Sequence, residues 1–386
     1  MLSLSKRQFL RLAGLAIADR ILPRWLWARP AEPGVDKNRK LIIVTFGGGV
    51  RYAETFTPEG LKNIPRLAGL KPRGLFFQNC FNKGVLSHYN STASILTGQW
   101  QRVDDFGFER PSSATIFEYY RKATGAGPMD AWAICTNKSF ASIASSGERD
   151  WGENYSANLV LPKQLLLEAV EGVIKRDLNQ GVANRENVLR QLEGILNAGY
   201  EGVGWTIFQG GKELNQQVKE TLTRSLVGYI YGPEAPNSGD ELTYFITQEV
   251  MREFAPRLIL VNFWDMDVAH WGAYSLYLQA ITKTDRLCGM LWNEIQSNPR
   301  YKDQTTLLIV PELGRDGDMN TANGFLNHRS GDPSCRHVWM LALGAGVSAG
   351  EIERPISHVD VCATAADMLG AKLPEISGQP VRELLS

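Results

Sequence analysis

Two carboxylates and a histidine follow one apolar segment of the chain. Residues 258–263 are mostly branched and apolar, which predicts a buried strand. Asp265, Asp267 and His270 come just after it. In open α/β sheets, ligands bind outside the carboxyl ends of the strands. Carboxylates and imidazoles are suitable ligands for a divalent ion such as zinc or manganese. Alternatively, the acids cap the next helix and His270 is a structural polar residue.

Apolar strand-like segments alternate with helical patterns along most of the chain. The predicted strands are residues 40–46, 74–80, 130–135, 258–263, 305–310 and 338–343. Such alternation predicts an α/β fold, here a three-layer α/β/α sandwich with a largely parallel central sheet covered on both faces. The parallel arrangement brings the carboxyl ends of several strands to one edge.

Residues 150–254 differ in character from the rest. Helical periodicity predicts helices over residues 161–177, 187–196 and 213–226, separated by Gly and Asn. Ser238–Glu241 is a capping-box pattern that predicts a further helix ending before Pro256. We therefore expect an inserted, mostly helical cap between core strands, which shapes access to the site.

Composition limits the classes of function. The chain has 386 residues, with 44% hydrophobic and 21% charged residues, as expected of a globular protein. Lys plus Arg and Asp plus Glu number 41 each, which gives no support for broad nucleic-acid binding. The five cysteines are scattered without a Cys-x-x-Cys pair, which argues against a disulfide framework and a structural zinc site.

The first 35 residues resemble a bacterial export signal of the twin-arginine type. Lys6 stands in the first arginine place before Arg7, and the apolar stretch 12–18 follows. This stretch is too short for a membrane span, which needs about 20 apolar residues. Small residues at Ala28 and Ala31 offer cleavage sites. We expect a periplasmic or secreted protein whose fold begins at residue 36. The alternative is an amphipathic N-terminal helix.

Several segments, taken in order, resemble the alkaline phosphatase superfamily, which includes sulfatases and nucleotide phosphodiesterases. The matching segments are residues 41–51, 94–98, 260–296, 305–347 and 355–378, the last containing Val359-Asp-x-x-x-Thr364. The likeness runs from about residue 40 to the end, except for residues 150–254. It implies the superfamily's sandwich fold and metal-dependent hydrolysis of phosphate or sulfate esters.

The resemblance implies a set of metal ligands near His270. One metal of the superfamily is held by an Asp and a His from the strand end together with a later His. Here these are Asp265 or Asp267, then His270, then His328 or His337. The spacing to His270 is three or five residues instead of the family's four, so either Asp remains possible.

A second metal site of the superfamily does not have its full set of ligands here. The positions that correspond to its ligands are occupied in this chain by Gly47 or Gly48, and then by Glu312 and Leu313. Glycine and leucine have no ligating side chain, which leaves Glu312 as the remaining candidate. We therefore expect one ion.

The nucleophile position of the superfamily, ten residues before Gly98, holds His88 with Ser87 beside it. The family has Thr, Ser or a modified Cys at this position. His88 could be a ligand, a general acid or base, or a covalent nucleophile. Arg315 could bind an anionic oxygen of the substrate or could be a surface salt-bridge partner.

The distribution of the histidines along the chain favours a functional site over a scaffold that has lost its chemistry. Four of the five lie in the matching segments, His88 lies at the nucleophile position, and none lies in residues 150–254: His88, His270, His328, His337 and His358. His358 lies in a helix-opening turn and is expected to be structural. The sequence thus favours an exported, single-metal hydrolase of small phosphate or sulfate esters. The alternative is a non-catalytic member of the family that acts in binding or protein–protein interaction.

Overall fold

The computed structural model describes residues 38–168, 214–230, 237–318, 324–374 and 376–385. Residues 36–386 form one compact unit that is distinct from residues 1–35. The expected export segment therefore lies outside the described residues.

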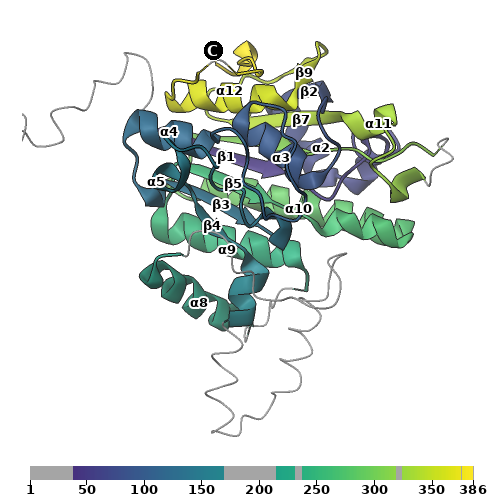
Figure 1. Cartoon of the computed structure of the whole chain (residues 1–386). Coiled ribbons are helices and arrows are strands. Elements are labelled where there is room, and N and C mark those ends of the chain that lie inside the picture. The colour runs from purple at the N-terminus through teal and green to yellow at the C-terminus, as the bar shows by residue number, and fades with distance from the viewer. Residues whose placement is uncertain (1–37, 169–213, 231–236, 319–323, 375, 386) are drawn as a thin grey trace, which may run out of the picture. The chain divides into compact units, whose positions relative to one another are not determined.

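A mixed, mostly parallel sheet runs through the centre of the domain (Figure 1). Its strands run in the order β4 (Asn158–Val160), β3 (Ala131–Cys135), β5 (Leu258–Asn262), β1 (Lys40–Thr45), β6 (Thr305–Val310), β7 (His337–Gly344), β2 (Leu75–Phe81) and β8 (Gly350–Ile352). β9 (Ile356–Ser357) also pairs with β2. Neighbours from β4 to β6 are parallel, whereas β7 is antiparallel to both β6 and β2.

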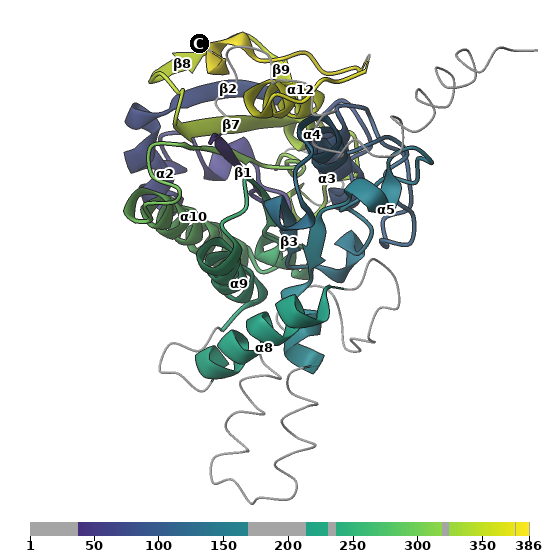
Figure 2. The same ribbon diagram turned by 90° about the vertical axis from the view of Figure 1, so that its left-hand side faces the viewer.

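Helices cover both faces of the sheet, which confirms the predicted sandwich (Figure 2). One face is covered by α2 (Pro65–Leu70), α9 (Gly239–Phe254) and α10 (Tyr274–Ser297), and the other by α3 (His88–Thr97), α4 (Ile116–Thr124) and α12 (His358–Leu369). The shorter or more peripheral helices are α5 (Gly152–Tyr155), α8 (Gln216–Ile230) and α11 (Pro333–Arg336). Short 3-10 turns are η2 (Tyr52–Glu54), η3 (Leu61–Asn63), η4 (Lys71–Arg73), η5 (Pro128–Asp130), η6 (Lys138–Phe140), η7 (Asp265–Trp271), η8 (Gly324–Leu326) and η9 (Arg382–Leu384).

The central strands are buried on both faces because their residues alternate between two cores. In β5, Ile259 and Val261 pack in the core under α9 and α10. Leu258 and Leu260 pack in the core under α3, α4 and α12. All four side chains are fully buried. This explains why a continuous apolar run, and not an alternating one, predicted the strand.

Three helix ends are capped by nearby residues, among them the predicted start at Ser238. At the start of α12, the Ser357 side chain accepts a hydrogen bond from the backbone N–H of Asp360, and Asp360 Oδ2 accepts one from Ser357 N at 2.8 Å. At its end, Gly370 has the left-handed backbone conformation of a C-cap, with φ 69°. Ser238 Oγ accepts from Glu241 N at 3.3 Å at the start of α9. These local signals are strong because each satisfies backbone groups that a helix end leaves unpaired.

The structure differs from the expected cap at both ends of residues 150–254. β4 is an edge strand of the main sheet, and α9 packs directly on β3 and β5, so both belong to the core. The helix predicted over 187–196, and most of the one over 161–177, lie outside the described residues. That the remainder shapes access to the site stays a prediction. The sequence pattern was ambiguous because a core helix and a cap helix have the same periodicity.

Among the described residues, no helix combines the length and apolar character that crossing a bilayer would require. All five cysteines are free and buried, in agreement with their scattered spacing.

Helix α2 is capped by a side chain from α10. Its N-cap residue Ile64 has no polar side chain and makes no side-chain cap. The buried Asp285 instead accepts from Arg66 N at 2.9 Å and from Leu67 N at 2.8 Å. Pro65 is the first residue of α2, where its missing N–H does no harm.

Asp285→Ala should destabilise the fold by about 1–3 kcal/mol, because it leaves two helix-terminal N–H groups without their acceptor. Asp285→Asn keeps one carbonyl oxygen and should lose less. Urea unfolding followed by circular dichroism measures both. Equal midpoints for Asp285→Ala and the wild type would contradict this capping function.

Candidate metal centre

The candidate residues lie beyond the carboxyl ends of neighbouring strands. Asp267 and His270 lie on η7, just after β5, and Glu312 and Arg315 follow β6. His88 is the first residue of α3, and His328 follows η8. The parallel order β5-β1-β6 brings these segments to one edge of the sheet.

The start of η7 is held by α9. Asp240, fully buried near the N-terminus of α9, accepts from Trp264 N at 2.7 Å and from Asp265 N at 3.0 Å. Its carboxylate also accepts from Thr136 Oγ1 at 2.8 Å. The chain leaves β5 in a fixed direction because these bonds restrain its first two residues after Phe263.

Gly47 and Gly48 let η7 pack closely against the end of β1. A Cβ at Gly47 would lie 2.0 Å from Phe263 O, and one at Gly48 would lie 2.5 Å from Asp267 N. Gly48 also has φ +94°, which favours glycine. These positions therefore have a packing function in this chain.

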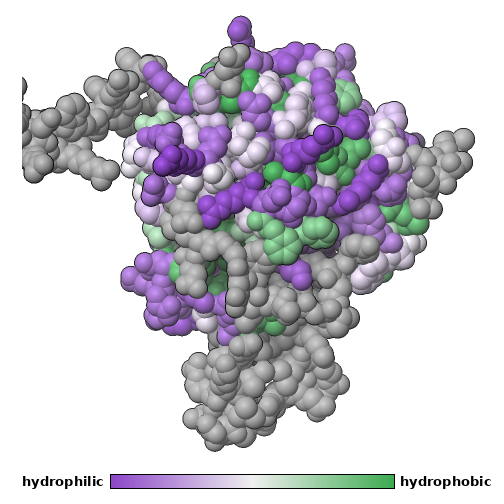
Figure 3. Space-filling model, in the orientation of Figure 1, coloured by the Kyte–Doolittle hydropathy of each residue, from purple (hydrophilic) through white to green (hydrophobic). Residues whose placement is uncertain are grey.

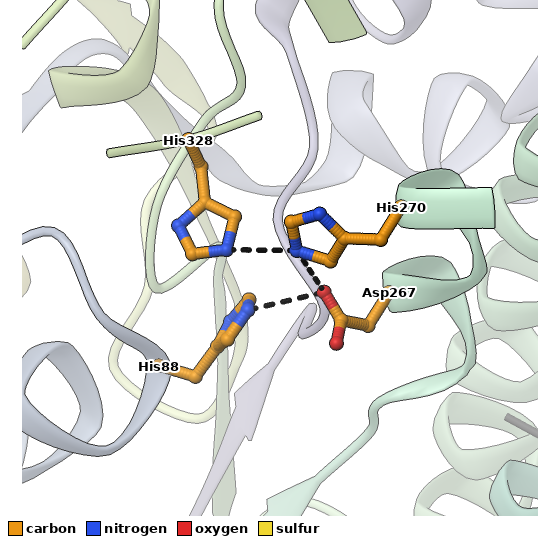
Figure 4. A group of neighbouring side chains, drawn as sticks. All are labelled: His88, Asp267, His270 and His328. Carbon is orange, nitrogen blue, oxygen red and sulfur yellow. Dashed lines mark hydrogen bonds and ion pairs between the residues drawn. The ribbon is translucent and has the colours of Figure 1, made fainter. Parts of the chain in front are cut away.

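Three imidazoles and one carboxylate converge at this edge (Figure 4). The possible ligand atoms of His88, Asp267, His270 and His328 all lie within 4.8 Å of one another. Asp267 Oδ1 is 3.2 Å from His88 Nε2 and 3.1 Å from His270 Nε2. His328 Nε2 is 3.1 Å from His270 Nε2. We call these four residues the His/Asp cluster.

Arg315 provides a buried positive charge beside the cluster. Its Nη2 lies 2.8 Å from Asp267 Oδ1, and its side chain is fully buried. Nε donates to Gly49 O at 3.0 Å, and Nη2 also donates to Gly48 O. Arg315 is thus an internal ion-pair partner and not a surface one.

Glu312 fixes the orientation of His88. Its Oε1 is 2.8 Å from His88 Nδ1 and also accepts from Gly48 N at 2.6 Å and Gly49 N at 3.1 Å. The donation from Nδ1–H leaves Nε2 directed into the cluster. A carboxylate behind a ligating histidine commonly sets the tautomer in metal sites. The structure leaves Glu312 itself outside the cluster.

The charges of the cluster shift its pKa values in different directions. Burial lowers the pKa of His88, but the charges of Asp267 and Glu312 outweigh this and raise it to about 9. Burial, and then the positive charges of His88 and Arg315, hold the pKa of His328 well below its usual range. Burial opposes ionisation of Asp267, yet His88, His270 and Arg315 hold the pKa of Asp267 well below its usual range. Without a metal, a proton on His88 and the charge of Arg315 together balance the carboxylates of Asp267 and Glu312.

The donor set fits a divalent ion. Ligand atoms about 2.0–2.1 Å from one tetrahedral zinc ion lie about 3.3–3.4 Å apart, close to the 3.1 and 3.2 Å separations within the cluster. The buried Nε2 of His88 faces Asp267 but makes no hydrogen bond of good geometry. His328 Nδ1 lies 3.3 Å from Leu86 O, which turns its Nε2 inward. Imidazoles with a carboxylate suit zinc, manganese or iron.

Several predicted site residues are not part of the cluster. Asp265 forms an ion pair with Lys283 at 3.0 Å. His337 Nε2 lies 3.0 Å from Gln78 O, and its ring stacks between Tyr52 and Phe81. Of the alternatives that the sequence left open, the structure thus brings Asp267 and His328 to His270.

Ser87 lies beside the cluster but is directed elsewhere. Its hydroxyl donates to Asp105 Oδ1 and accepts from Asn90 Nδ2 at 3.0 Å. His358 is buried at the start of α12, and burial lowers its pKa to about 3. A neutral, structural histidine at this position agrees with the expectation.

Sequence reasoning missed Asp240 and the pairing of Glu312 with His88. Asp240 lies within the Ser238–Glu241 capping pattern. Acidic residues are expected at a helix start, so the sequence offered no reason to assign Asp240 a second function. Glu312 follows His88 by 224 residues in the chain, so no local pattern links the two. Glu312 stands three residues before Arg315, and both side chains are buried. Their burial would have indicated an internal function, but the sequence does not show burial.

Comparison with known proteins gives structural matches only. No family model and no curated protein matches the sequence. The alkaline phosphatase PafA has a TM-score of 0.56 at 11% identity, over 90% of this chain and 99% of that chain. An alkaline phosphatase superfamily protein from Vibrio parahaemolyticus has a TM-score of 0.53 at 13% identity, over 91% and 71%. The phosphonate monoester hydrolase of Agrobacterium radiobacter has a TM-score of 0.53 at 13% identity, over 90% and 77%.

These identities are low, but the matches extend over most of this chain. They agree with the order of segments along the sequence and with the mostly parallel sheet. The chain therefore has the fold of the alkaline phosphatase superfamily.

Proposed function

We propose that the chain is a metal-dependent hydrolase of small phosphate or sulfate esters, with one divalent ion held by the His/Asp cluster. The observation that carries this proposal is the convergence of three imidazoles and one carboxylate from separate segments, with ligand atoms within 4.8 Å. The fold supports it further, since the solved structures that share the fold include an alkaline phosphatase and a phosphonate monoester hydrolase.

A bound divalent ion would supply Lewis acidity toward the ester and a bound water of lowered pKa. The chain's own residues orient and balance that site. Glu312 holds His88 through Nδ1, and Arg315 holds Asp267 through Oδ1. Arg315 also adds a positive charge, which favours an anionic ester group nearby.

His88 acts in this proposal as a ligand and not as a covalent nucleophile. Its Nδ1 is engaged by Glu312, and its Nε2 faces the other cluster atoms. Ser87 does not serve as the nucleophile in this proposal, because its hydroxyl is directed toward Asp105 and not toward the cluster. Water is therefore the attacking group.

A single ion is the proposed stoichiometry. Gly47, Gly48 and Leu313 have no ligating side chains, and the first two pack against η7. Glu312 Oε1 already has three N–H neighbours. No second ligand set replaces the missing residues among the described ones, where His88, Asp267, His270 and His328 form the one candidate group.

A non-catalytic protein is the second candidate, and Arg315 is the observation that favours it. Its guanidinium lies 2.8 Å from the same Asp267 oxygen that two imidazoles face. Together with a proton on His88, it balances the buried carboxylates without any metal. Metal binding therefore separates the two candidates.

His270→Ala should weaken zinc binding by more than the roughly 10–100-fold that is typical of losing an outer-shell partner, because it removes a ligand. Metal analysis of the purified protein and calorimetric titration with zinc and manganese measure this. The matched control is His337→Ala, which removes an imidazole outside the cluster and should leave the affinity unchanged. Wild-type protein that carries no metal and gains none would remove the hydrolase proposal and leave the non-catalytic one.

Zinc affinity should rise with pH toward about 9, the pKa of His88 in the metal-free protein, because zinc must displace the proton on Nε2. Glu312→Gln removes one of the charges that raise this pKa. The rise should then be complete at a lower pH, with an overall affinity about 10–100-fold weaker. Zinc titrations over a pH series test this, and identical pH profiles for the two proteins would contradict the coupling.

We further propose that the protein is exported, on the basis of Lys6-Arg7 and the short apolar stretch 12–18. Cell fractionation should find the mature protein outside the cytoplasm, and Lys6→Gln with Arg7→Gln should retain it inside. Export of the double variant at the wild-type level would refute the proposal.

A further inference from the structure

A cationic cavity of about 520 Å³ lies next to the His/Asp cluster. Four cationic residues line it together with Leu86, Ser87 and Asp105: Lys83, Arg102, Arg329 and Arg336. The volume is in the range of small-molecule sites, about 300–1,000 Å³. On the face that carries α3, hydrophilic side chains are interspersed with apolar ones (Figures 1 and 3).

The cavity is adjacent to the cluster but separate from it. No member of the His/Asp cluster lines it. Leu86 and Ser87 form a wall that the two sites share. Ser87 directly precedes His88 in the chain, and Leu86 O lies 3.3 Å from His328 Nδ1. A ligand in the cavity would therefore lie close to an ester group held at the cluster.

The only carboxylate of the cavity lining is already neutralised by its neighbours. Asp105 accepts from Ser87 Oγ, accepts from Asn90 Nδ2 at 2.8 Å, and pairs with Arg329 at 3.3 Å. Four cationic side chains less this one carboxylate leave a net charge of +3 in the lining.

The remaining cations differ in how firmly they are held. Arg336 Nη1 donates to Asn82 O at 3.1 Å and to Gly84 O at 3.0 Å, which fixes its guanidinium in the wall. Lys83 and Arg102 are exposed, and in the described part of the chain neither has an anionic partner. Free cations around a small cavity bind oxyanions well, and a guanidinium can bind phosphate or sulfate with two parallel hydrogen bonds.

We propose that this cavity binds a second phosphate or sulfate group of the substrate, so that the substrate is an ester with at least two anionic groups. The inference rests on the proposed function, since it assigns the reacting group to the His/Asp cluster. It narrows the substrate class from simple monoesters to compounds with a second oxyanion nearby.

The experiment compares ligands with one and two anionic groups. Calorimetry on the zinc-loaded protein measures affinities for methanesulfonate and for alkane disulfonates with two to four carbons between the groups. The corresponding phosphonates form a second arm, which separates a preference for sulfate-like groups from one for phosphate-like groups. The best two-group ligand should bind the wild type about tenfold more tightly than its one-group counterpart, since each exposed cation contributes about two- to fivefold.

In the double variant Lys83→Gln with Arg102→Gln, the ratio of the affinity for the two-group ligand to that for the one-group ligand should fall to about one. The affinity for methanesulfonate should stay unchanged. The matched control is Lys302→Gln, an exposed lysine between α10 and β6 at the opposite end of the strands, which should keep the wild-type ratio. Raising the salt concentration should lower the ratio for the wild type, because exposed charges are screened.

Three outcomes would overturn the proposal, and a fourth separates it from the proposed function. An equal affinity for one-group and two-group ligands, or a ratio that the double variant leaves unchanged, excludes the cavity as a second site. A double variant that weakens methanesulfonate as strongly as the disulfonates makes the cavity the sole anion site, which also overturns the proposal. Failure of the hydrolase proposal is recognised independently, by the absence of zinc binding in the His270 experiment.

Discussion

Asp267 is a carboxylate buried at the edge of a sheet, and the cost of burying its charge is the constraint on which the site depends. A buried charge is strongly destabilising unless it is paired and hydrogen-bonded. Arg315, His88 and His270 meet this requirement from three parts of the chain, all converging on one oxygen. Glu312 and Asp240 hold the neighbouring turns in place, because their carboxylates accept hydrogen bonds from backbone N–H groups of those turns.

The glycine turn after β1 and Glu312 shape the same region. Gly47 and Gly48 allow the segment that begins η7 to approach within contact distance of the end of β1. Glu312 accepts from the backbone N–H of Gly48 and turns His88 toward the other cluster residues. The close packing at this turn and the orientation of His88 are therefore structurally linked.

Much of the fold could be predicted from the sequence, because β5 and β6 are long apolar runs and the ends of α12 carry strong capping signals. The antiparallel direction of β7 could not, since strand direction depends on a connection whose path the sequence does not reveal. For the site, the segments were predictable, but the choice between Asp265 and Asp267 was not. They are two residues apart on a tight turn, so one pairs with Lys283 and the other with Arg315. His328 follows an irregular loop, where no periodicity indicates side-chain direction.

The proposed role of His88 as a ligand, with water as the attacking group, also determines the stereochemistry of the displacement. A covalent intermediate requires two successive in-line attacks, so the configuration at phosphorus is retained overall. Direct attack by water is a single in-line displacement, and it inverts that configuration. In the proposed reaction, a chiral phosphate ester would therefore give a product of opposite hand. Because no phosphorylated protein forms, alcohols in the medium could not intercept one and receive the phosphoryl group.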